Sequence, residues 1–156
     1  MKRVIVERFR AIVVFVLCVL AFSSCRTMQT NLTPGEDLRS YKRAFIEATR
    51  PKDPFQIYPA LVWELRDMGF DVVGVKMQNP TDSDLIVRFS YDEGWDLTAY
   101  LRAVQFEFIN AKNGRVVVVS SYQSTGLWRG VRDGRLESAF NNLRAKNGYP
   151  PTKQFQ

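Results

Sequence analysis

The sequence predicts an α+β fold, in which two helices pack on one face of a mixed, mainly antiparallel sheet of about five strands to form a two-layer sandwich. Three observations predict it. Two segments repeat apolar residues at helical spacing along a single stripe, several segments alternate with the period of a strand, and an Asn-Gly pair separates two strand segments as in a hairpin. The predicted order is β-α-β-β-β-β-α. Because each helix has one apolar stripe, both are expected on the same face.

A β-α-β unit is predicted at the start of the domain. Its strands are residues 41–48 and 70–75, and an amphipathic helix ending at Met68 joins them. Strands joined by a helix in this way form β-α-β units when they pair in parallel.

The start of this helix stays open on sequence alone. Asp53 is a good N-cap and Pro54 a good first helical residue. Pro59 would kink a helix interior, which favours a start near Tyr58 instead. Gly69 suits the left-handed position that follows a helix end.

The second half of the chain is predicted to be antiparallel. The expected elements are a turn at 79–82, a strand at 85–91, a polar connection at 91–96, strands at 99–110 and 115–123, and a last helix with Leu136, Ala139, Phe140 and Leu143 on its stripe. The four valines 116–119 predict a central strand or one covered on both faces. Asn147-Gly148 and the prolines after it end the last helix.

Residues 111–114, Ala-Lys-Asn-Gly, form the predicted hairpin turn, with Gly114 in the positive-φ region. A two-residue Asn-Gly loop and a longer loop with a bulge differ by one residue in strand register. Both remain open at this point.

The amino terminus has the layout of a secretory signal. Four basic residues within 1–10 precede residues 11–22, which carry no charge. A spanning helix needs about 20 apolar residues, so this run is short for one. Residues 1–24 are therefore predicted to be a signal peptide.

The residues 20–25, Leu-Ala-Phe-Ser-Ser-Cys, resemble the lipobox of bacterial lipoproteins, with Phe22 where the family more often has Leu. The resemblance implies cleavage before Cys25, a diacylglycerol on its sulfur and an acyl chain such as palmitate on its amino group. Three acyl chains exceed the two signals needed for stable anchoring. Arg26, where inner-membrane lipoproteins commonly have Asp, implies the periplasmic face of the outer membrane, the alternative being another extracytoplasmic membrane face.

After the anchor, residues 25–38 are polar and are predicted to be the lipidated cysteine with a flexible tether. Residues 39–156 are then the single α/β domain. Removing residues 1–24 lowers the net charge from +6 to +3. The remaining charge is uneven, at −4 over residues 31–110 and +6 over 111–156.

Composition excludes several kinds of chemistry. The chain has no histidine, which excludes Ser-His-Asp triads, Cys-His pairs and histidine-ligated zinc. Cys18 lies in the predicted signal, so the mature chain has one cysteine and no internal disulfide. No cofactor-binding motif is recognised, and a chain exported to the envelope is not expected to bind nucleic acid.

Asp92, Glu93 and Asp96 are the weak candidates for a carboxylate pair acting on a glycan, or for oxygen ligands of a metal ion. Carboxylates so close in a loop usually point into water, which is the favoured interpretation, so no catalytic or metal residue is assigned.

A second candidate surface surrounds Trp128, where Arg129, Arg132 and Arg135 border an aromatic residue. Trp and Arg are enriched in binding hot spots, so a contact with an envelope protein or an anionic glycan is the hypothesis here. The alternative is that Trp128 covers the core while the arginines face solvent.

The element order, with the late Asn-Gly hairpin and a closing helix before Tyr149-Pro150, resembles small uncharacterised bacterial envelope lipoproteins with a two-layer α/β domain, and more remotely the domains of curli-secretion and penicillin-binding-protein-activator lipoproteins. The expected function is a non-catalytic binding or assembly accessory in the cell envelope. The alternatives are a carboxylate-dependent glycan- or lipid-modifying enzyme and a small-ligand carrier.

Overall fold

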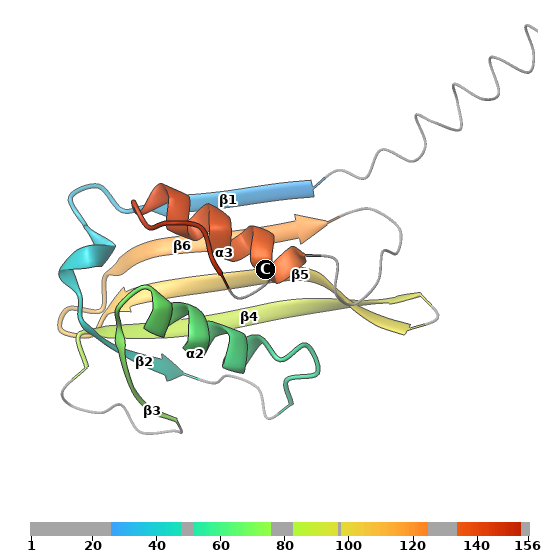
Figure 1. Cartoon of the computed structure of the whole chain (residues 1–156), viewed down its shortest axis with the longest axis horizontal. Coiled ribbons are helices and arrows are strands. Elements are labelled where there is room, and N and C mark those ends of the chain that lie inside the picture. The colour runs from blue at the N-terminus through green and yellow to red at the C-terminus, as the bar shows by residue number, and fades with distance from the viewer. Residues whose placement is uncertain (1–25, 48–51, 76–82, 97, 125–133, 154–156) are drawn as a thin grey trace, which may run out of the picture.

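The computed structural model describes residues 26–47, 52–75, 83–96, 98–124 and 134–153. Its elements are β1 (Arg26–Leu32), η1 (Leu38–Ser40), β2 (Arg43–Glu47), α2 (Ile57–Asp67), β3 (Asp71–Val75), β4 (Leu85–Asp96), β5 (Thr98–Asn110), β6 (Val116–Ser124) and α3 (Arg135–Lys146). They form one mixed sheet in the order β1-β6-β5-β4-β2-β3, with both helices on one face (Figure 1). The predicted α+β class is confirmed, with six strands in the described part of the chain.

The core fills the space between the helices and one face of the sheet. Alternate residues of the long central strands point into it, as their period of two requires. Phe106 of β5 is fully buried and stacks on Phe140 of α3, with ring centroids 4.9 Å apart. A small cluster of Phe45, Ile86 and Ile109 lies apart from this core. No helix among the described residues is long and apolar enough to cross a membrane.

The β-α-β unit is present, because β2 pairs in parallel with β3. Helix α2 begins at Ile57, so the later of the two starts is correct. Asp53 still caps the helix from outside: its carboxylate accepts the amides of Ile57 at 2.9 Å and Tyr58 at 2.7 Å. Pro59 falls in the first turn, where a missing N–H costs nothing. Gly69 ends the helix at φ +91°, as predicted.

The β5–β6 hairpin settles the open register. The amide of Asn110 donates to the carbonyl of Arg115 at 2.9 Å, which leaves a four-residue loop with Gly114 at φ +72°. The register shifts between Phe108 and Ile109, so the longer loop with a bulge is the correct alternative. β6 lies between β1 and β5, which agrees with the central position predicted from its valines.

The prediction of a flexible tether at residues 25–38 is wrong. Residues 26–32 form strand β1, which pairs with β6 along its whole length, and Leu38 is fully buried. The Thr30 hydroxyl donates to Asn142 of α3 at 2.6 Å and lies 2.9 Å from the Ser120 hydroxyl of β6. Backbone pairing and these hydroxyls hold a segment that has few apolar residues, so the described fold begins at residue 26 rather than 39.

The prediction of a connecting loop at residues 91–96 is also wrong. β4 continues to Asp96 and pairs with β5 as far as Thr98, with a shift between Asp92 and Glu93. Polar side chains are tolerated on this part of the strand because it is exposed to solvent, while the backbone hydrogen bonds remain.

A buried ionic network joins the two helices to the end of the chain. The guanidinium of Arg144 donates to Glu64 at 2.7 Å, to Asp67 at 2.6 Å and to the carbonyl of Pro150 at 3.0 Å. Arg144 and Glu64 are each 1% exposed. The hydroxyl of Thr152 donates to the second oxygen of Glu64. Each charge in this network therefore has a partner inside the fold, as burial demands.

Replacing Arg144 with Met should lower the free energy of unfolding by about 3–5 kcal/mol, because Glu64 would remain buried without its cation. Urea unfolding followed by circular dichroism measures this. The matched control is the exposed Arg102→Met, which should change the free energy by at most about 1 kcal/mol. A change of similar size in both variants would contradict the prediction.

The loss of unfolding free energy in Arg144→Met should also depend on pH. Burial raises the pKa of Glu64 above its ordinary 4.5, while Thr152 and Arg144 oppose this rise. Without Arg144 the pKa rises further, so the folded variant binds more protons than the unfolded chain above pH 4.5. The unfolding free energy of the variant should therefore fall, relative to wild type, as pH rises from about 4.5 to 7.5. Urea titrations at both pH values test this, and equal losses at both would contradict it.

Candidate functional site

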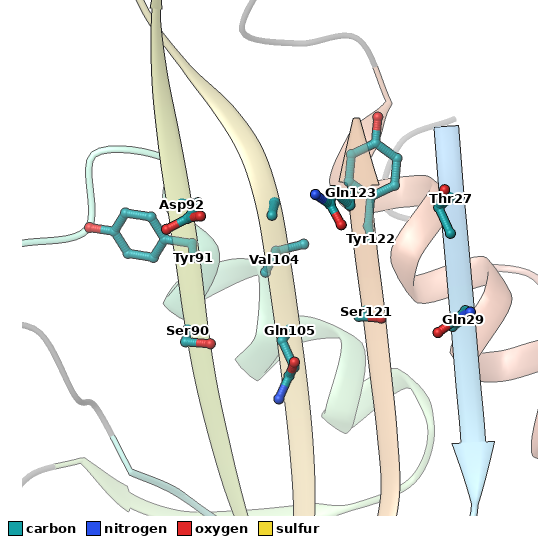
Figure 2. A pocket seen from close by; sticks show the side chains of 11 residues that line it. Thr27, Gln29, Ser90, Tyr91, Asp92, Val104, Gln105, Ser121, Tyr122 and Gln123 are labelled. Carbon is teal, nitrogen blue, oxygen red and sulfur yellow. The ribbon is translucent and has the colours of Figure 1, made fainter. Parts of the chain in front are cut away.

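The face of the sheet turned away from the helices carries a row of uncharged polar side chains across four strands. The pairings Gln29 with Ser121, Ser121 with Gln105, and Gln105 with Ser90 align these residues on β1, β6, β5 and β4. Neighbouring strands are about 4.8 Å apart, so the row is roughly 14 Å long. Figure 2 shows these four side chains at similar height across the strands.

A second row lies beside the first, toward the end of the sheet where β1 begins. It consists of Thr27, Gln123, Ala103 and Asp92 in the same strand order. Ala103 has the smallest side chain of the four and sits near the middle of the row. The face is hollowed here into an open depression of about 380 Å³, lined by both rows and by Tyr91, Val104 and Tyr122 (Figure 2).

Hydrogen bonding is the chemistry that this depression offers. Glutamine amides both donate and accept, and hydroxyls do the same. Asp92 carries the one charge among its lining side chains, and its carboxylate is 3.0 Å from the guanidinium of Arg102. The lining thus presents neutralised or uncharged polar groups, whereas typical small-molecule pockets are mostly apolar. It suits a polar, uncharged ligand lying across the strands.

The neighbouring part of the same face has a different character. Arg88 of β4 pairs with Glu47 of β2 at 2.5 Å, and Arg43 pairs with Asp71 of β3 at 3.5 Å. The outer face of β2, β3 and the first part of β4 thus carries paired opposite charges. The two rows that line the depression consist mainly of uncharged side chains.

The carboxylates predicted as weak candidates are placed on a strand. Asp92 lines the depression, while the neighbouring Glu93 is exposed and does not line it. Asp96 ends β4. Within the described residues, no three acidic, histidine or cysteine side chains gather as a metal site would require.

Arg135 does not form the exposed partner-binding surface predicted for it. The side chain is 6% exposed, donates to the carbonyl of Leu101 and lies with its guanidinium carbon 5.2 Å from the ring centre of Tyr100. Position 135 is the first residue of α3, which turns the side chain toward β5. Cys25, Trp128, Arg129 and Arg132 lie outside the described residues.

The polar rows were not predicted from sequence, although a partial signal exists. Gln105 alternates with Val104 and Phe106, and Ser121 and Gln123 flank Tyr122, which marks the outward positions. Alignment into rows depends on the register of three strand pairs, and the sequence predicts a tether where β1 lies.

Gln105→Ala should change the free energy of unfolding by less than about 0.5 kcal/mol, because the side chain is exposed to solvent. The neighbouring Phe106→Ala, on the buried face, should lose about 3–5 kcal/mol. Denaturant unfolding of both variants provides the comparison. A loss above 1.5 kcal/mol for Gln105→Ala would show that the row is structural.

Comparison with known proteins identifies the fold. No family model and no curated protein match the chain. Among solved structures, it is similar to a DUF4136 family protein from Bacteroides thetaiotaomicron at 14% identity and a TM-score of 0.56, over 80% of this chain and 96% of that one. It is also similar to PelC from Paraburkholderia phytofirmans, a dodecamer, at 17% identity and a TM-score of 0.52, over 81% and 99% of the two chains. At these identities, the similarities establish a shared two-layer α/β fold.

Proposed function

We propose that this protein is a lipid-anchored, non-catalytic binding module of the bacterial cell envelope, which holds a polar ligand on the open face of its sheet. The observation that carries the binding role is the pair of aligned rows of amide and hydroxyl groups in the depression. Such groups hold a ligand by hydrogen bonds, and amides and hydroxyls of Ser and Thr do not ionise near neutral pH. The hydrogen-bonding groups of the depression therefore support a binding role.

The anchor in this proposal is Cys25, on the strength of the lipobox resemblance. Strand β1 begins at Arg26, the next residue. Consecutive Cα atoms are about 3.8 Å apart, so acyl chains on Cys25 would hold the end of the sheet directly at the bilayer. The polar rows begin on the same strand, at Thr27 and Gln29, and the depression would lie close to the membrane surface.

The periplasmic face of the outer membrane is the proposed location. It rests on Arg26 at the position after the lipidated cysteine, and it assumes a double-membraned cell. The similar protein PelC is a dodecamer. By analogy, the proposal includes assembly of this protein from several copies.

Cys25→Ser should abolish incorporation of labelled palmitate and leave the precursor at full length. Lipidation occurs on the cysteine sulfur and on the amino group freed by cleavage, so both changes should appear together. Labelling of cells that produce wild type or Cys25→Ser, followed by gel electrophoresis, measures them, with Cys18→Ser as the matched control. Palmitate incorporation that persists in Cys25→Ser would contradict the proposed anchor.

A photo-crosslinking benzophenone residue at Gln105 should capture a component of the envelope in living cells. Gln105 sits in the middle of the first row, whereas Lys112 is also exposed but lies in the distant β5–β6 turn, and it provides the control position. The expected result is a product specific to position 105 that decreases when Gln29 and Ser121 are both replaced by Ala. Products of equal amount at positions 105 and 112 would overturn the binding role of the depression.

A further inference from the structure

Trp95 is the most exposed large apolar side chain in the described part of the molecule. It is 78% exposed, against 42% for Met28, 41% for Leu32 and 38% for Trp63. A large aromatic ring in water forgoes the stabilisation that burial would supply. An exposed ring of this size is therefore a candidate for contact with another surface.

The residue lies on a two-stranded ribbon that extends past the end of the sheet. β6 ends at Ser124, and its pairing with β5 ends where Gln123 meets Ala103. β4 and β5 continue together beyond this point, and Trp95 pairs with Ala99. Ala99 is four residues past Ala103, which corresponds to roughly 13 Å of strand.

This ribbon is braced against the rest of the domain. The ring of Tyr100 lies over Gly94, where any Cβ would overlap it. Arg135 at the start of α3 lies against the same ring and donates to the carbonyl of Leu101. The first residue of α3 thus contacts the ribbon, and these contacts support the strands that carry Trp95.

The ribbon projects at the same end of the molecule as the proposed anchor. Arg26 pairs with Ser124, at the end of β6, so the chain enters β1 at this end. In Figure 1 the β4–β5 ribbon reaches past the beginning of β1 on the same side. A bilayer holding acyl chains on Cys25 would therefore lie next to the end of the ribbon.

We propose that Trp95 is a second membrane contact, which inserts into the interfacial zone of the bilayer that receives the Cys25 acyl chains. This inference rests on the proposed lipid anchor. Trp is favoured at membrane interfaces because its ring is apolar while its N–H finds a polar partner. Two contacts at one end of the sheet fix the tilt of the domain, whereas acyl chains alone permit it to rotate.

The charges beside Trp95 specify the kind of surface. Glu93 is exposed two residues away, and Asp92 pairs with Arg102. An anionic lipid surface would repel the carboxylate of Glu93, so the contact is made to a zwitterionic bilayer. Adding anionic lipid should weaken the contact of Trp95 rather than strengthen it.

Fluorescence with one tryptophan at a time tests the contact. The full chain is produced in cells as Trp63→Phe/Trp128→Phe, which leaves Trp95, and as Trp95→Phe/Trp128→Phe, which leaves the control Trp63 on α2. Each protein is reconstituted with phosphatidylcholine vesicles, with and without bromine on the acyl chains near the headgroup. Palmitate labelling of the same preparations reports the anchor separately.

Trp95 emission should shift to shorter wavelength in vesicles and lose at least about half its intensity with brominated lipid, whereas Trp63 emission should change little. Replacing a third of the lipid with phosphatidylglycerol should reduce the quenching of Trp95. Emission from Trp95 that stays solvent-like overturns the contact. A blue shift without bromine quenching also overturns it, since the ring would then be covered by protein. Palmitate incorporation together with solvent-like Trp95 emission overturns the second contact and leaves the anchor standing, whereas missing palmitate overturns the anchor and, with it, the contact as proposed.

Discussion

The buried guanidinium of Arg144 is the interaction on which the two-layer arrangement depends. The helices cover different parts of the sheet, since α3 lies over β1, β6 and β5 while α2 lies beside β3. Arg144 connects them with a long side chain that binds Glu64 and Asp67 of α2. Its third contact, to the carbonyl of Pro150, fixes the chain after α3. The three nitrogens of one planar guanidinium thus connect two helices and the carboxyl-terminal segment. The compact ammonium group of a Lys would not make these three hydrogen bonds in the same geometry.

Strand β1 has the corresponding role at the other end of the chain. It pairs with the outer edge of β6, so the backbone N–H and C=O groups of that edge have partners. Because the Thr30 hydroxyl donates to Asn142, the Ser120 hydroxyl is the donor in the bond between the two hydroxyls. This short chain of hydrogen bonds joins β1, β6 and α3. The position of the proposed anchor therefore depends on a strand that belongs to the sheet.

Local chemistry made much of the fold predictable, while contacts between distant residues did not show in the sequence. Gly69 and Gly114 occupy the positive-φ positions expected of them, since helix ends and tight turns need that conformation. β1 was missed because its stability comes from backbone pairing, which leaves little apolar signal. The sequence predicts a surface position for Arg135, because the burial of its side chain depends on Leu101 and Tyr100, which are more than 30 positions earlier. The polar rows were missed for the same reason.

The polar face of the sheet and the core are two consequences of one strand register. On β5, Val104 and Phe106 enter the core, while Ala103 and Gln105 stand on the opposite face. A slip of one residue would exchange these sets, at the cost of burying glutamine and exposing phenylalanine. Packing against α3 therefore selects the register that aligns Gln105 with Ser121 and Ser90. The alignment of the polar row therefore follows from the packing of the core and needs no stabilisation of its own.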